Sequence, residues 1–129
     1  MSLLNEISRR FRSLPVSEKL ILINVFIFIA DRLLVFLFKL SPDFFMRWGD
    51  LPWNIPDFLL QPWSLITYAF FHAGFGHLFW NMLLLYFFGR LFLELFSPRR
   101  FVTVYFLGAA SGGLFFILSY NFLAYRKYS

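Results

Sequence analysis

The sequence predicts an all-α membrane protein built from long apolar helices, and two observations support the membrane class. The chain is 60% hydrophobic and contains 21 phenylalanines, whereas soluble domains are about 45–50% apolar. Three apolar segments, at about residues 20–38, 77–96 and 98–122, are long enough to cross a bilayer, which takes roughly 20 residues. The length allows one domain, 1–129, or a piece of one.

Charge and cysteine content narrow the possible partners. The net charge is +5, but the basic residues lie at the ends of the apolar segments instead of along one soluble face. This distribution argues against nucleic acid and favours membrane lipids as a partner. The chain has no cysteine, which excludes disulfides and thiol-ligated metals. We expect no cofactor and no metal.

Residues 1–18 form a basic segment with helical periodicity. Its apolar residues share one helical stripe, and its arginines lie elsewhere on the surface. The stripe consists of Leu3, Leu4, Ile7, Phe11 and Leu14, and the arginines are Arg9, Arg10 and Arg12. The pattern predicts a helix lying on anionic lipid. A disordered basic tail is the alternative for so short a segment.

Residues 20–38 are predicted to form the first membrane helix. A long preceding segment and the lack of a small-residue cleavage site favour a retained helix over a cleaved signal peptide. Asp31 and Arg32 are adjacent charges within this helix. Charged side chains at this depth must turn inward or extend to the interface, so we interpret the pair as serving packing or topology.

Residues 41–76 are predicted to form a membrane-embedded loop. Four prolines interrupt helical structure, while tryptophan and phenylalanine are dense enough to favour the bilayer interface. We expect short helical pieces buried against neighbouring helices, because irregular backbone cannot face lipid directly. Gly74 and Gly76 are expected to allow a sharp turn into the next helix.

The helices at 77–96 and 98–122 are predicted to form a hairpin. Ser97 can cap the second of them, and Pro98 can occupy its first position. That helix carries a run of small residues, which permits close helix approach. The run is Gly108, Ala109, Ala110, Ser111, Gly112 and Gly113. We expect this stripe and the polar face of 77–96 to meet further helices.

Lysine and arginine are more frequent before the first helix and around the 97–100 turn than in the loop at 41–76. The positive-inside rule therefore predicts a multi-pass protein whose amino terminus and 97–100 turn are cytoplasmic. His72, His77 and Asn81 would lie toward the outer leaflet. We expect the membrane to be a bacterial inner membrane.

His77 and Asn81 are four residues apart, so a helix places them on one face about one turn from each other. Polar side chains in hydrocarbon indicate a site, or hydrogen bonds that hold neighbouring helices together. The spacing leaves both interpretations open. A zinc site from His72 and His77 is not expected, because five residues align poorly on a helix and no third ligand is near.

The order of these residues resembles the rhomboid family of intramembrane serine proteases. The most specific part is the H-x4-H-L-x2-N-M-L run that begins at His72. The resemblance also rests on Pro62, Trp63, Thr67, Gly89, Glu94, Tyr105 and the glycine-rich third helix. It implies a core of six membrane helices, an embedded loop after the first, and cleavage of membrane-protein substrates at or near transmembrane segments.

The resemblance implies that His77 and Asn81 help form an oxyanion hole, with His72 in a supporting network and Trp63 at the end of the embedded loop. The family's nucleophilic serine opens helix four in a G-x-S-G motif, and its general-base histidine lies on helix six. We expect both to be absent from residues 1–129, so that this chain alone is inactive. Helices four to six, or a partner supplying them, would complete the site.

Ser111 and Ser119 are the two serines that could replace the family's nucleophile. Ser111, in A-A-S-G, is ~20 Å of helix above the hairpin turn, whereas His77 is ~30 Å above it, so we expect a packing role. Ser119 is nearer in depth but has no glycine turn to present its hydroxyl.

The sequence departs from the family in having Ser64 where arginine often follows the tryptophan, and Ser97 and Pro98 where glycine often occurs. Two alternative functions remain. One is an inactive rhomboid-like protein that binds transmembrane helices through the glycine stripe and Asn81. The other is a pathway for a polar solute or a metal.

Overall fold

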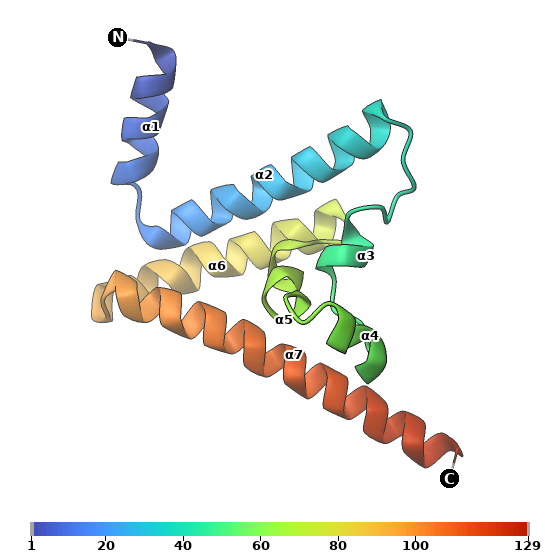
Figure 1. Cartoon of the computed structure of the whole chain (residues 1–129). Coiled ribbons are helices and arrows are strands. Elements are labelled where there is room, and N and C mark those ends of the chain that lie inside the picture. The colour runs from blue at the N-terminus through green and yellow to red at the C-terminus, as the bar shows by residue number, and fades with distance from the viewer. Residues whose placement is uncertain (1, 129) are drawn as a thin grey trace.

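The computed structural model describes residues 2–128, and the described chain is helical without strands (Figure 1). Its elements in chain order are α1 (Leu3–Ser13), α2 (Val16–Leu37), α3 (Met46–Gly49), α4 (Ile55–Leu60), α5 (Ser64–Thr67), the short 3-10 helix η1 (Tyr68–Phe70), α6 (Phe75–Leu95) and α7 (Pro98–Tyr128). Three of them, α2, α6 and α7, are long and apolar enough to cross a membrane. The predicted all-α membrane fold is confirmed.

The long helices extend somewhat beyond their predicted ranges. The α2 helix begins at Val16 instead of residue 20, α6 begins at Phe75 instead of 77, and α7 continues past 122 to Tyr128. The extensions of α2 and α7 include charged residues, Glu18 and Lys19 in the first and Arg126 and Lys127 in the second. Hydropathy marks the part of a helix that crosses hydrocarbon, and the backbone helix continues past it.

The structure gives the basic segment at residues 3–13 as a helix. The hydroxyl of Ser2 accepts a hydrogen bond from the Asn5 amide at 3.4 Å, which caps the first turn. One turn on, Arg10 and Glu6 form an ion pair at 2.6 Å. Leu14 and Pro15 then adopt extended backbone between α1 and α2.

The hairpin between α6 and α7 forms as the sequence predicts. Pro98 is the first residue of α7, and the hydroxyl of Ser97 accepts a hydrogen bond from the Arg100 amide at 3.2 Å. Across the turn, the rings of Phe92 and Phe101 pack edge to face with centroids 5.6 Å apart. A serine cap and an N-terminal proline replace the glycine turn here.

The interior of the described chain is small, and its outer surface is apolar. Buried hydrophobic residues among those described are Leu20, Leu78, Phe101 and Ile117. In contrast, Phe36 and Phe115 are more than 70% exposed, at 79% and 74%. Exposed apolar surface on this scale is unusual for a protein in water, and it fits helices whose surroundings are lipid.

The embedded loop lies between α7 and the pair formed by α2 and α6 (Figure 1). Side chains of the loop satisfy part of its irregular backbone. The carbonyls of residues 48–50 accept hydrogen bonds from the side chains of Trp63 at 2.8 Å, Thr67 at 2.7 Å and Gln61 at 2.9 Å. This pattern meets the requirement that polar backbone be shielded from hydrocarbon.

Ser64, where the family often has arginine, is fully buried and donates a hydrogen bond to the Gln61 carbonyl at 2.7 Å. It therefore supports the turn between α4 and α5. Trp63, Thr67 and Gln61 make the longer-range contacts that hold the loop together.

The embedded loop packs against the small residues of α7. The Tyr68 hydroxyl donates to the Ala109 carbonyl at 2.6 Å. A Cβ on Gly113 would lie 2.9 Å from Leu65 and 3.1 Å from Leu51, so only glycine fits without repacking. Gly108 meets nothing within 4 Å. The expectation that the whole stripe awaits further helices is therefore wrong for Gly113 and stays a prediction for Gly108.

The turn before α6 does not require glycine. Gly74 precedes the helix with φ −153° and ψ 167°, which is extended backbone open to any residue. No glycine in the described chain has positive φ, and a Cβ on Gly74 or Gly76 would meet nothing within 4 Å. The prediction of a glycine-dependent sharp turn is wrong.

Candidate functional site

His72 occupies the extended segment that joins η1 to α6. The residue is only 5% exposed, and its Nδ1 atom has no hydrogen-bond partner. Its ring lies against the ring of His77 in the first turn of α6, with centroids 5.2 Å apart and planes at 73°. A buried polar atom with no partner is uncommon in folded proteins and often belongs to a functional site.

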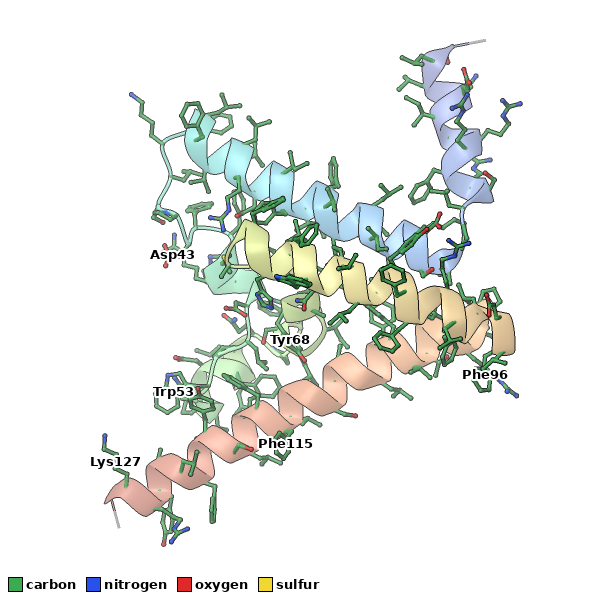
Figure 2. The ribbon with its side chains drawn as sticks, turned by 180° about the vertical axis from the view of Figure 1, so that it is seen from behind. Asp43, Trp53, Tyr68, Phe96, Phe115 and Lys127 are labelled. Carbon is green, nitrogen blue, oxygen red and sulfur yellow. The ribbon has the colours of Figure 1, made fainter. Side chains whose placement is uncertain are left out.

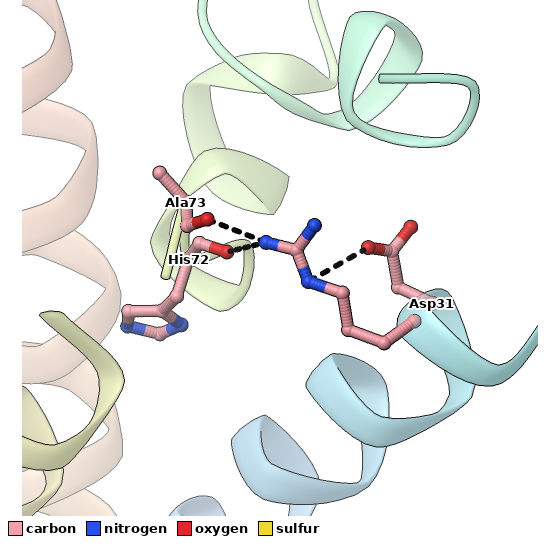
Figure 3. Close-up of polar contacts among 4 residues, drawn as sticks. Asp31, His72 and Ala73 are labelled. Atoms are coloured by element: carbon pink, nitrogen blue, oxygen red, sulfur yellow. Dashed lines mark hydrogen bonds and ion pairs between the residues drawn. The ribbon is translucent and has the colours of Figure 1, made fainter. Parts of the chain in front are cut away.

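The segment containing His72 is held by the charged pair of α2 (Figure 3). The guanidinium of Arg32 donates to the carbonyl of His72 at 3.5 Å and, more closely, to the carbonyl of Ala73. Asp31 is 6% exposed, and its carboxylate lies 4.0 Å from the Arg32 guanidinium. The sequence assigned this pair to packing or topology, whereas the structure links it directly to the candidate site.

The surroundings of His72 favour its neutral form. Burial lowers the pKa of His72 from the ordinary value of 6.5, the charge of His77 lowers it further, and the nearby Phe70 backbone partly opposes these two effects. The neutral imidazole has one nitrogen that donates and one that accepts a hydrogen bond. His72 can therefore relay a hydrogen bond at neutral pH without carrying charge.

His72 and Asn81 line the same open groove, which has a volume of about 350 Å³. Asn81 is half-buried, and Tyr105 of α7 forms part of the opposite wall. The other lining residues are Ala69, Met82, Leu84, Leu85 and Phe88. The groove thus lies where the embedded loop, α6 and α7 meet, and both polar and apolar side chains line it.

His77 has a different position from the one that its spacing to Asn81 suggests. Its side chain is exposed and contacts the His72 ring, and it does not line the groove. The structure therefore places His72 and Asn81 along one groove, while His77 adjoins this groove through its contact with the His72 ring. Neither Ser111, which is exposed, nor Ser119, which is half-buried, lines the groove.

Tyr105 and Asn24 are site neighbours that sequence reasoning did not identify as a pair. Asn24 is fully buried and donates to the Leu20 carbonyl at 2.8 Å and to the Tyr105 hydroxyl at 3.5 Å. This contact joins α2 to the groove wall on α7. The sequence could have indicated Asn24, because a lone carboxamide in an apolar helix usually has a hydrogen-bond partner. It could not have indicated Tyr105 as that partner, because the pairing depends on how α2 and α7 are rotated about their axes.

Among residues 2–128, no group of three or more His, Cys, Asp or Glu side chains is placed to hold a metal ion. The site therefore consists of hydrogen-bonding groups: an imidazole pair, a carboxamide and a phenol. Such groups can bind and orient a polar group or stabilise negative charge on an oxygen.

The fold and the site define a multi-pass helical membrane protein with a polar groove at the end of an embedded loop. Residues 59–125, just over half of the chain, match the Rhomboid domain family. The chain belongs to the rhomboid family, a family that includes intramembrane proteases. No solved structure matches it.

Three proteins of Arabidopsis thaliana are similar to parts of the chain. Rhomboid-like protein 16, chloroplastic, is 35% identical over 79 residues, which cover 55% of this chain and 24% of the relative. RHOMBOID-like protein 12, mitochondrial, is 38% identical over 61 residues, covering 47% and 18%. Inactive RHOMBOID-like protein 8 is 34% identical over 70 residues, covering 54% and 20%.

The chain thus spans at most about a quarter of the curated relatives it matches, at 24%, 18% and 20% of their lengths. These relatives are plant proteins, two of them named for organelles. They give no support to the expected bacterial inner membrane. Family membership and the membrane-spanning helices together support an integral membrane protein.

Proposed function

We propose that this chain supplies the oxyanion-hole half of a rhomboid-type intramembrane serine endopeptidase, which cleaves membrane proteins at or near their transmembrane segments. The supporting observation is the groove in which His72 and Asn81 face the same open space, with His77 against the His72 ring. These residues lie in the part of the chain that matches the Rhomboid domain family.

The proposed chemistry is acyl transfer. A serine hydroxyl attacks the scissile carbonyl, and negative charge develops on the carbonyl oxygen of the tetrahedral intermediate. The Asn81 carboxamide and the His77 imidazole donate hydrogen bonds to that oxygen. Neutral His72 orients His77 from the buried side, since the two rings are in contact. Further helices, corresponding to helices four to six of the family, or a partner chain supply the nucleophile and the general base.

The oxyanion role is tested with Asn81→Asp in the complete gene product. This change keeps the side-chain size and removes the N–H donors, so we expect a loss of on the order of 10² to 10³ in turnover. Turnover is measured by cleavage of a single-span membrane substrate in detergent. Ser111→Ala is the matched control, because Ser111 is exposed and outside the groove. Equal turnover in Asn81→Asp and wild type would contradict the assignment.

A second candidate is a catalytically inactive rhomboid-like protein that binds transmembrane helices. It is favoured by the similarity to a relative named inactive and by the open surface at Gly108. The complete gene product would then react with no fluorophosphonate serine probe. A photo-crosslinker at position 108 would still capture a transmembrane helix, and Asn81→Asp would weaken that capture. Probe labelling of the wild type would decide for the protease.

A further inference from the structure

Helix α1 projects from the rest of the protein with its apolar face uncovered. None of its residues is buried, and Leu3, Leu4 and Ile7 are 72%, 76% and 53% exposed. Figures 1 and 2, which view the molecule from opposite sides, both show α1 extending away from the other helices. An amphipathic helix with an open apolar face requires a partner surface.

The other faces of α1 carry positive charge. Arg10 pairs with Glu6 at 2.6 Å, whereas Arg9 and Arg12 are exposed and lie on the faces away from the apolar stripe. At the elbow with α2, the Lys19 ammonium lies 5.9 Å from the centre of the Phe11 ring. The helix therefore combines an apolar stripe with cations available to an anionic partner.

The position of α1 in the fold adds to this charge. The first turn of α2 packs against the last third of α6, since a Cβ on Gly89 would lie 2.6 Å from the Ser17 Cβ. This contact places α1 at the same end of the protein as the α6–α7 turn (Figure 1). Arg99 and Arg100 follow that turn and Arg90 precedes it on α6, all three exposed, with Glu94 the one acidic residue between positions 90 and 100. Basic side chains from three helices thus gather at one end of the protein, the basic end.

The direction of α1 fits a membrane surface. In both views it runs steeply across the line of α2 and α6 instead of continuing α2 (Figures 1 and 2). When α2, α6 and α7 span the bilayer, a helix in this orientation lies along the interface at the basic end. Its apolar stripe can then enter the acyl boundary while the arginines remain among the headgroups.

We propose that α1 is an interfacial helix that binds the anionic phospholipid surface at the basic end of the protein. The apolar stripe supplies the insertion, and Arg9, Arg12 and Lys19 supply the preference for anionic over zwitterionic headgroups. The attraction depends on surface charge and is therefore weakened by salt. This binding requires no catalytic activity and is independent of the proposed protease function.

The chain has no cysteine, so one introduced cysteine gives a unique labelling position in the full chain. Ile7→Cys on the apolar stripe and Ser13→Cys on the polar side are labelled with the fluorophore NBD. Each protein is reconstituted into phosphatidylcholine vesicles with or without phosphatidylglycerol. We expect blue-shifted, brighter NBD emission at position 7 when phosphatidylglycerol is present, reversed by high salt, and a much smaller change at position 13.

The charge contribution is tested by adding Arg9→Gln and Arg12→Gln to the Ile7→Cys protein. We expect the apparent surface-binding constant to fall on the order of tenfold, because each basic side chain near an anionic surface contributes substantially. These residues lie outside the bundle, and unchanged tryptophan emission serves as the folding check. Water-like emission at position 7 in both vesicle types would overturn the proposal. Equal blue-shifted emission in both vesicle types would overturn it in favour of binding to neutral lipid. Emission that rises with the density of protein in the vesicles would overturn it in favour of contact with a second copy of the chain.

Discussion

Among single residues, Arg32 makes the contact that ties α2 to the candidate site. Its guanidinium reaches from α2 to two successive carbonyls, those of His72 and Ala73, at the entrance to α6 (Figure 3). Its stem also places the guanidinium 5.1 Å from the centre of the Phe28 ring. One planar donor thereby fixes the backbone on which the buried imidazole is mounted.

Arg32→Gln should destabilise the protein by roughly 1–3 kcal/mol, because hydrogen bonds from a charged donor are stronger than neutral ones. The measurement is SDS-induced unfolding in mixed micelles, followed by tryptophan emission. Arg32→Lys keeps the charge but loses the two-pronged geometry, so it should fall between wild type and Arg32→Gln. Identical midpoints for wild type and Arg32→Gln would show that the contact does not hold the segment.

Acidification should destabilise the fold through His72. Its pKa is lowered in the folded state by burial and by the charge of His77, so the unfolded chain binds the proton first as pH falls. The contribution of His72 to the free energy of unfolding is fully present above the ordinary pKa of 6.5. It is lost as pH falls from there toward the lower folded-state pKa.

Thermal unfolding in detergent, measured at successive pH values, checks this expectation. The wild type should lose more stability below pH 6.5 than His72→Gln, which keeps a polar side chain that does not titrate. Parallel pH profiles for the two proteins would assign the acid sensitivity to another group.

At the scale of elements, the crossing of α2 and α6 depends on Gly89. A Cβ at this position would lie 2.6 Å from the Ser17 Cβ and 3.4 Å from the Phe101 ring. Ser17 is fully buried, so its Cβ cannot move aside without moving α2. Small residues at such crossings allow the close backbone approach on which membrane helix packing depends.

Gly89→Ala should therefore cost about 1–3 kcal/mol as an overpacking change. Gly108→Ala is the matched control, since its Cβ would meet nothing within 4 Å, and it should gain roughly 0.5–1 kcal/mol from helix propensity. Both are measured by unfolding in mixed micelles. A Gly89→Ala protein as stable as the control would mean that the two helices separate easily.

The sequence was sufficient to locate the long helices, but it did not predict how each helix is rotated about its own axis. Apolar length located α2, α6 and α7, and Ser97 with Pro98 located the hairpin turn. The exposure of His77 and the approach of Tyr105 to Asn24 depend on side chains from three elements. Helical spacing fixes which residues share a face, but the direction of that face is set by packing such as Ser17 on Gly89.

The embedded loop shows the same limit. Prolines and aromatics identified residues 41–76 as irregular and membrane-associated, but α3, α4 and α5 are each six residues or shorter. Helices this short have no periodicity to read. Their positions follow from specific contacts, such as the Trp63 indole on the Trp48 carbonyl at 2.8 Å, that local sequence does not encode.

At the scale of the whole molecule, the two ends of the helical bundle differ in charge. Asp43 and Phe96, labelled in Figure 2, lie at opposite ends of the protein. Arg90, Arg99 and Arg100 accompany the Phe96 end, together with the basic residues of α1. By the positive-inside rule, this end should face the cytoplasm and the embedded loop the opposite side.

Single-cysteine labelling tests the orientation. Asp43→Cys and Arg99→Cys are both exposed positions, and the chain contributes no other thiol. With a membrane-impermeant maleimide on spheroplasts of an expressing bacterium, we expect Asp43→Cys to react at once and Arg99→Cys only after permeabilisation. The reverse order of labelling would contradict the assigned topology.

The hydrogen bonds that satisfy residues 48–50 come from Gln61, Trp63 and Thr67, all within the same loop. None of these donors belongs to α6 or α7. During synthesis, residues 48–50 can therefore be shielded once Thr67 has left the ribosome, whereas the Trp53 carbonyl receives its hydrogen bond, at 2.8 Å, only when Asn121 of α7 is in place. Folding of the loop is thus expected to begin before α7 has been made and to be completed when α7 packs against it.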